Sequence, residues 1–164
     1  MEETTIKLLE SARKAVTDVA KLTSEEKNEA LRRMAAALVQ NKDSILIENA
    51  VDIENARGRI SDVMIDRLRL TEGRIRDMAD GIRQVADLPD PVFSIDREYV
   101  RDDGLIIRKV RVPLGVIAII YESRPNVTSD AASLAFINGF LKATITNESL
   151  KHETLKFKDN DILT

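Results

Sequence analysis

Residues 113–128 read PLGVIAIIYESRPNVT, and this stretch decides the fold. Leu114–Tyr121 is almost entirely apolar and rich in β-branched residues, which is typical of a parallel strand covered by helices on both faces. The turn Glu122–Asn126 then leads into a helix start at Thr128–Asp130. Residues 113–139 therefore predict a strand, a loop and a helix. These make half of a βαβ unit, and the parallel neighbour of the strand must come from later sequence.

The sequence before this unit predicts a series of helices. Thr23, three residues before Glu26, gives the pattern of a capping box at the start of the second helix. Asp43 or Ser44 is expected to cap the third helix, and Thr71 the last long one. The apolar positions that recur at helical spacing, and so predict the buried faces, are Ile6, Leu9, Ala12, Val16, Val19, Ala30, Leu31, Met34, Leu38, Val39, Ile45, Leu46, Ile53, Ala56, Ile75, Met78, Ala79, Ile82 and Val85.

A β-hairpin is expected between the helices and the strand–loop–helix unit. Pro89 and Pro91 end the helical half, because proline cannot continue a helix. Asp96–Arg101 and Leu105–Val112 are β-prone runs, and the Asp-Asp-Gly that separates them is a strong turn signal.

The chain therefore divides into four parts: a helical region 1–91, a hairpin 92–112, a partial α/β unit 113–139 and a tail 140–164. The tail is rich in Lys, Thr and Asn, and its apolar residues follow no clean period. Thr144–Thr146 offers a short strand, while a poorly ordered tail is the favoured interpretation.

Composition excludes several classes of protein. The 164 residues carry a formal net charge of −3, so the basic run Arg108–Arg111 indicates a solvated hairpin face rather than a nucleic-acid patch. No apolar run is long enough to span a bilayer, and no signal peptide is expected at the N-terminus. The chain contains no Cys and a single His, His152. Disulfides, thiolate or His-based metal sites and thiol nucleophilic catalysis by this chain are therefore not expected.

The loop after the apolar strand is the candidate site, because ligands of α/β sheets bind at the carboxyl ends of the strands. Arg124 is suited to pair with a phosphate or a carboxylate, and Asn126 offers an amide donor to a developing oxyanion. The alternative is a turn whose polar residues satisfy local backbone groups. Neither a Gly-x-Gly-x-x-Gly motif nor a Walker-type loop occurs in the sequence.

Several motifs carry a resemblance to a known family. They are VPLGVI at residues 112–117, YESRPNVT at 121–128, DRLRLT at 66–71 and RQVADLPDP at 83–91. Together they closely resemble the gamma-glutamyl phosphate reductases, also called glutamate-5-semialdehyde dehydrogenases, within the aldehyde dehydrogenase superfamily. The resemblance covers about residues 1–139.

The resemblance implies a cytoplasmic oxidoreductase of proline biosynthesis that reduces gamma-glutamyl phosphate with NADPH. In such enzymes a Cys thiolate attacks the acyl phosphate, hydride reduces the thioester and an Asn amide holds the oxyanion. Asn126 matches that amide. Tyr121, Glu122, Ser123, Arg124 and Pro125 match the residues that line the nicotinamide side of the cofactor site.

The resemblance also implies the fold class: α/β, with an N-terminal helical region, a hairpin of the kind that joins an oligomerisation sheet, and the first strand–helix piece of a Rossmann-like cofactor-binding domain. The family's later cofactor-binding strand and catalytic Cys are missing, so a truncated chain is expected that is inactive alone and does not bind NADPH tightly. Self-association through the hairpin or an open sheet edge is also expected. The alternatives are a non-catalytic interaction module that pairs with another chain and, more weakly, a stand-alone dinucleotide binder.

Overall fold

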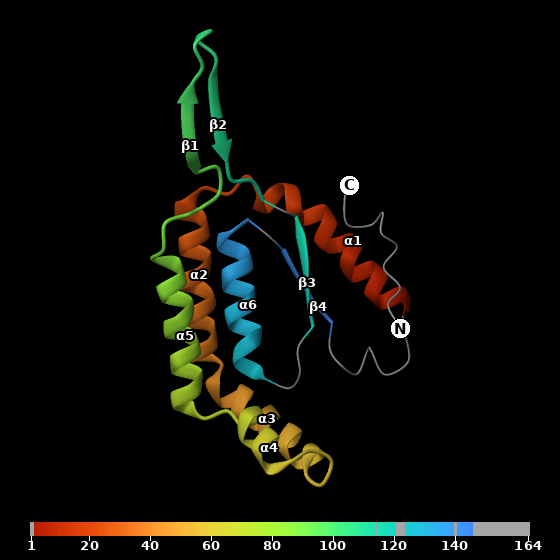
Figure 1. The fold of residues 1–164 in the computed structure, drawn as a ribbon. Helices are drawn as coiled ribbons and strands as arrows, with labels where there is room; N and C mark the ends of the chain where they lie inside the picture. Colours follow the sequence, from red (N-terminus) through yellow and green to blue (C-terminus); the bar gives the residue numbers. More distant parts are fainter. Residues whose placement is uncertain (1, 114, 121–123, 140, 146–164) are drawn as a thin grey trace.

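The computed structural model describes residues 2–113, 115–120, 124–139 and 141–145 (Figure 1). Within these residues six helices and four strands follow one another along the chain. They are α1 (Glu2–Val19), α2 (Ser24–Gln40), α3 (Lys42–Ala56), α4 (Asp62–Leu68), α5 (Glu72–Ala86), β1 (Ile95–Val100), β2 (Ile106–Val110), β3 (Val116–Ile120), α6 (Pro125–Ile137) and β4 (Leu141–Ile145).

The core forms where α2, α5 and α6 lie side by side (Figure 1). The predicted apolar faces of α2 and α5 are confirmed here, because their small and aliphatic side chains meet in one cluster. The buried members of the cluster are Leu31, Ala35, Ala79, Ile82, Ala86 and Ile137. The alanines let the helix backbones approach one another closely, which suits a chain with few aromatic residues.

Two of the predicted helix caps are confirmed. Thr23 accepts a hydrogen bond from the Glu26 amide, and the Glu26 carboxylate accepts one from the Thr23 amide, so the capping box is complete. Thr71 caps α5 by accepting from the Arg74 amide. The expected cap of α3 is wrong, because that helix begins at Lys42 and its N-cap position makes no side-chain hydrogen bond.

Strand β3 pairs in parallel with β4, from Val116 opposite Leu141 to Ile120 opposite Ile145. The two strands lie between α6 and α1 (Figure 1). The expectation that this chain lacks a second parallel strand is therefore wrong. The strand suggested at 144–146 lies instead at Leu141–Ile145.

A tight turn explains this second strand. Gly139 has a φ of +70° and donates its amide to the Phe136 carbonyl, so it reverses the chain directly after α6. Lys142 and Ala143 have little intrinsic preference for strands, which hides β4 from a reading of the sequence. The rest of the tail, including His152, lies outside the described residues.

The predicted hairpin is confirmed. β1 and β2 pair antiparallel from Val100 opposite Ile106 to Ile95 opposite Val110, with an irregularity near Arg97. The hairpin projects from the end of the helical layer (Figure 1). Arg108–Arg111 are exposed, in line with the expectation of a solvated hairpin face.

A buried ion pair ties the segment before the hairpin to the helices. Lys27 has a side-chain exposure of 1% and lies 2.9 Å from the carboxylate of Asp90. Asp90 also accepts hydrogen bonds from the Ser24 hydroxyl and the Val92 amide. Burial raises the pKa of Asp90, but these hydrogen bonds and the charge of Lys27 outweigh burial, so its pKa lies below the ordinary value.

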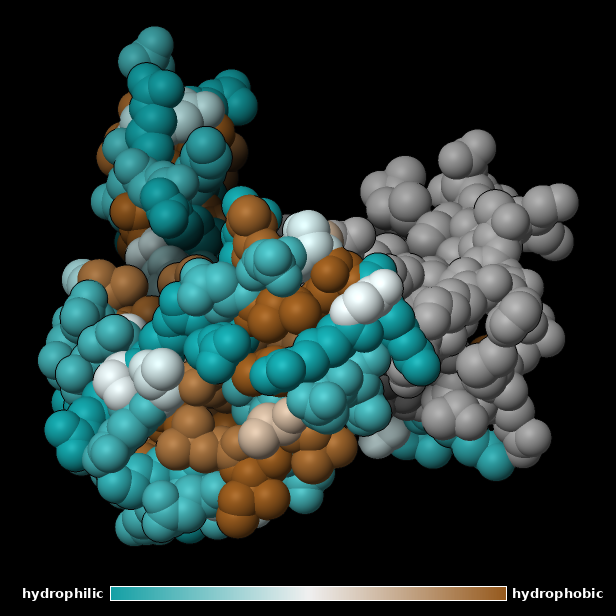
Figure 2. Space-filling view, turned by 90° about the horizontal axis from the view of Figure 1, so that it is seen from below, coloured by the Kyte–Doolittle hydropathy of each residue, from teal (hydrophilic) through white to brown (hydrophobic). Residues whose placement is uncertain are grey.

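The opposite end of the molecule, made by α3 and α4, has a mixed surface. Seen from that end, hydrophobic side chains lie between hydrophilic ones (Figure 2). Ile47, Val51 and Val63 are the exposed large hydrophobic side chains of these two helices within the described part of the chain.

Candidate functional site

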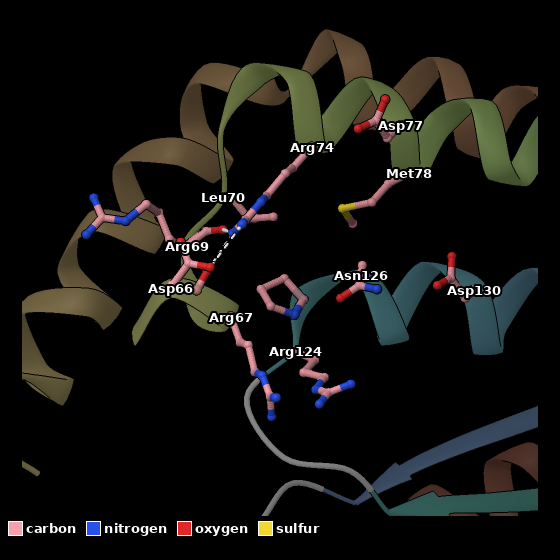
Figure 3. A pocket seen from close by; sticks show the side chains of 11 residues that line it. Asp66, Arg67, Arg69, Leu70, Arg74, Asp77, Met78, Arg124, Asn126 and Asp130 are labelled. Carbon is pink, nitrogen blue, oxygen red and sulfur yellow. Dashed lines mark hydrogen bonds and ion pairs between the residues drawn. The ribbon is translucent and has the colours of Figure 1, made fainter. Parts of the chain in front are cut away.

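A pocket of about 550 Å³ lies between the connection from α4 to α5 and the N-terminal end of α6 (Figure 3). It brings together two of the motifs singled out above, DRLRLT and YESRPNVT, which are far apart in the sequence. Its lining residues are Asp66, Arg67, Arg69, Leu70, Arg74, Asp77, Met78, Arg124, Pro125, Asn126 and Asp130.

Helix α6 begins earlier than the sequence predicts. Pro125, not Thr128, is its first residue, and Arg124 stands at the N-cap position without a side-chain capping bond. Proline suits this first position because its fixed φ matches the helix and its missing N–H is not needed there. Asn126 therefore lies in the first turn of a helix rather than in a loop.

The Asn126 side chain is free to act on a ligand. It lines the pocket and makes no hydrogen bond with the described residues, whereas its backbone carbonyl accepts from the Ser129 hydroxyl. In Figure 3 it points towards α5 and Met78. An amide donor at a helix N-terminus, where backbone N–H groups add positive potential, is suited to stabilise a negative oxygen.

Arg124 and Pro125, both expected near a cofactor, also line the pocket. The other three residues of that expectation, Tyr121, Glu122 and Ser123, lie outside the described residues. In the view of Figure 3 the side chains of Arg124 and Arg67 both extend away from Asn126, and both residues line the pocket. Neither arginine makes an ion pair within the described part of the chain, so both charges are available to an anion.

Arg67 is the residue that sequence reasoning missed. It comes from α4, and its motif was used only as a sign of family resemblance. A polar residue near the end of a short helix gives no signal of its own, since surface arginines are common there. Only the packing of α5 against α6 shows that it shares a pocket with Arg124.

Two further findings concern the described residues only. They contain no group of three or more His, Asp or Glu side chains placed to hold a metal ion. In the same part of the chain, no helix has both the length and the apolar character that crossing a membrane requires.

The architecture defines an α/β chain with a polar pocket where a parallel strand passes into a helix. No family model matches the sequence. Individual relatives do match, and they confirm the resemblance to the gamma-glutamyl phosphate reductases.

The enzyme of that name from Geobacillus sp. is 47% identical over 160 residues, which span 93% of this chain and 38% of the relative. The one from Streptococcus suis is 54% identical over 138 residues, which span 83% of this chain and 33% of the relative. The chain thus corresponds to about a third of the length of these relatives, and the Geobacillus alignment extends beyond residues 1–139.

Solved structures agree. The crystal structure of gamma-glutamyl phosphate reductase from Thermotoga maritima superposes with a TM-score of 0.83 at 37% identity, over 89% of this chain and 36% of the other. The enzyme from Saccharomyces cerevisiae gives a TM-score of 0.82 at 30% identity, over 89% of this chain and 38% of the other.

Proposed function

We propose that this chain provides the N-terminal third of a gamma-glutamyl phosphate reductase, a cytoplasmic oxidoreductase of proline biosynthesis. The observation that carries the proposal is the Asn126 amide in the first turn of α6, which has no hydrogen-bond partner among the described residues and lies in a motif that resembles that family's. The identity of 47–54% to enzymes of that name supports it.

In this proposal Asn126 donates its side-chain amide to the oxygen of the substrate carbonyl as that oxygen becomes negative. A donor fixed in a helix stabilises this charge without having to reorganise. Such a donor raises kcat by a factor of roughly 10²–10³. The acyl phosphate of gamma-glutamyl phosphate is the group that receives this help.

NADPH fits the charge of the site. The Arg124 guanidinium makes no ion pair with the described residues and lies beside the N-terminal end of α6, so it is suited to a cofactor phosphate. Pro125 adds an apolar ring to the pocket wall. When bound, NADPH supplies the hydride. In this interpretation β3, α6 and β4 begin a Rossmann-like domain, in which Tyr121–Pro125 line the nicotinamide side.

The 164-residue chain by itself is proposed to be inactive. It has no Cys and so cannot form the thioester that the reductase mechanism requires. Its affinity for NADPH is expected to be weak for a related reason, because one strand–helix turn offers only part of a dinucleotide site.

A chimera tests the proposal directly. The matching third of the Geobacillus sp. enzyme is replaced by residues 1–139 of this chain, and NADPH-dependent reduction of gamma-glutamyl phosphate is measured. We expect an active chimera whose kcat falls by about 10² when Asn126→Ala is introduced. Ser44→Ala, on the exposed side of α3, is the matched control and should leave kcat unchanged. A folded chimera without activity, or one indifferent to Asn126→Ala, contradicts the proposal.

A further inference from the structure

Side chains of α3 and α5 bind the backbone of residues 66–70, which comprise the end of α4 and the start of its connection to α5. The Arg74 guanidinium donates to the Asp66 carbonyl at 2.5 Å and to the Arg69 carbonyl at 2.6 Å. Its other nitrogen lies 3.3 Å from the Asp66 carboxylate.

Asn49 holds the same connection from the side of α3. Its amide nitrogen donates to the Leu68 carbonyl at 2.9 Å, and its amide oxygen accepts from the Leu70 amide at 2.7 Å. Asn49 is only 5% exposed, so its side chain satisfies these backbone groups where water does not compete. Arg74 and Asn49 together fix the backbone on both sides of Arg67 and Arg69.

The hydrogen bonds of Arg74 and Asn49 do not involve the Arg67 side chain, and its charge has no ionic partner among the described residues. The Asp66 carboxylate is turned to Arg74. In the close view Arg69 extends away from the pocket, whereas Arg67 extends to the same side as Arg124 (Figure 3). Asp130 lies further along α6, one turn beyond Asn126. Two guanidinium groups therefore line the same pocket without an acidic partner among the described residues. Two positive charges in one pocket repel each other, and both attract an anion that binds there.

We propose that the pocket binds an oxyanion, a phosphate or a carboxylate, between Arg67 and Arg124. Arg74 and Asn49 are positioning residues that hold Arg67 in place without contacting the anion. Guanidinium groups suit both anions because their planar donors match two oxygens at once. This deepens the proposed function, in which substrate and cofactor carry such groups, but it does not depend on Asn126.

Isothermal titration of the full chain tests the pair. Inorganic phosphate and glutarate are the probes, and the tighter of the two shows whether the site prefers phosphate or carboxylate. Arg67→Ala and Arg124→Ala should each weaken binding of that probe at least tenfold. Arg59→Ala removes the same charge from the loop between α3 and α4, outside the pocket, and should change it less than twofold. Equal loss in all three variants, or no binding of either probe to the unaltered chain, overturns the proposal.

A charge-preserving pair of variants tests the positioning role. Arg74→Lys keeps the positive charge but cannot bridge two carbonyls, and we expect it to weaken binding about fivefold. Arg76→Lys makes the same change two residues along α5, outside the pocket, and should have less than a twofold effect. Wild-type affinity in a folded Arg74→Lys chain overturns the positioning role.

Amide hydrogen exchange tests the proposal on the unaltered chain, so its result does not depend on whether a variant folds. Saturating phosphate should slow exchange at the Leu70 amide and at the first turn of α6, and leave the hairpin unchanged. No slowing at either place overturns the proposal. Phosphate binding with an inactive chimera would count against the proposed function alone, and an active chimera without phosphate binding against this inference alone.

Discussion

Lys27 places an ammonium group inside the molecule, where it meets three different parts of the chain. It lies on α2, pairs with Asp90 in the segment before the hairpin and approaches the Ile137 carbonyl at the end of α6 within 3.5 Å. The desolvation of such a group is costly, and only the pairing and the hydrogen bonds around Asp90 offset it. The pair therefore specifies how these segments meet more than it adds to stability.

Removing one partner of this pair should be strongly destabilising. Lys27→Met keeps much of the side-chain volume but leaves the Asp90 carboxylate buried without a cation, and we expect a loss of about 3–5 kcal/mol. Denaturant unfolding measures it. Arg32→Met is the control: Arg32 and Asp87 form a pair between the same segments, with side chains 55% and 71% exposed. That pair should contribute at most about 1 kcal/mol. Equal effects of the two variants would contradict the role of Lys27.

The same carboxylate predicts a dependence of stability on pH. The pKa of Asp90 is lowered in the folded chain from an ordinary value of 3.8, so its contribution is fully present above that pH. It is lost as the pH falls below 3.8 through the lowered pKa, because the unfolded chain then binds the proton more readily. Unfolding of Asp90→Asn and of the unaltered chain, compared between pH 2 and 6, measures this. The two curves should approach one another towards low pH; parallel curves would contradict the prediction.

At the scale of the elements, helix starts are set by caps that only partly follow from sequence. Thr23 and Thr71 could be predicted, since each accepts a bond from an amide three residues ahead. Ser44 has the same chemistry but lies inside α3, which begins at once after the end of α2. The sequence contains the capping pattern in all three places, and the packing of the neighbouring helix decides which is used.

These caps give a matched pair of substitutions. Thr71→Ala leaves the Arg74 amide without an acceptor and should destabilise the chain by about 1 kcal/mol. Ser44→Ala removes an exposed hydroxyl from a residue within α3 and should be neutral or slightly stabilising, because alanine is the better helix former. Thermal unfolding of both variants decides between these roles. A larger loss for Ser44→Ala would mean that the sequence pattern, not the structure, identifies the cap.

The turn from α6 to β4 gives a second pair. Gly139 and Gly58 both have positive φ, +70° and +72°, so a side chain is strained at either position. A Cβ at Gly139 would lie 3.1 Å from the Pro113 ring, whereas at Gly58 nothing lies within 4 Å. We expect Gly58→Ala to cost about 1 kcal/mol. Gly139→Ala should cost about 1–3 kcal/mol more, because of the crowding. Similar losses of stability for the two variants in denaturant unfolding would show that the residues around Gly139 shift at little cost to accept a side chain.

At the scale of the whole molecule, the hairpin exposes apolar side chains that another chain can cover. Val100 and Ile106 are opposite one another in its ladder and are 62% and 53% exposed. Exposed apolar residues on a projecting two-stranded sheet suit association with another copy of the chain. We propose that the chain self-associates through this hairpin.

Sedimentation tests this association. The double variant Val100→Lys, Ile106→Lys should shift the chain towards monomer at concentrations where the unaltered chain forms larger species, with unchanged helical content. Val63→Lys places the same charge on α4, at a residue 63% exposed, and should leave association unchanged. A monomeric wild type over a wide concentration range would contradict the proposal.

Most of the fold could be predicted, because periodicity and turn chemistry act locally. The helices, the hairpin and β3 all follow from such signals. Burial of Lys27 and Asn49 could not be predicted, since both residue types are usually exposed and their partners lie far along the chain. The candidate site also has residues that could be predicted from the sequence and one that could not. Arg124 and Asn126 stand at a predictable strand end, whereas Arg67 joins them only through tertiary packing.

Because α1 packs against β3 and β4, it cannot complete its native packing until late in the synthesis of the chain. The principal contacts of this first helix are with strands that come last in the described chain. A ribosome adds about 5–20 residues per second, so α1 is synthesised on the order of ten seconds before β4 exists. During that interval its apolar face has nothing native to cover it and is open to chaperones and proteases. The exposure lasts until β4 has emerged from the ribosome and pairs with β3, so a pause in translation before that point should lower the yield of folded protein.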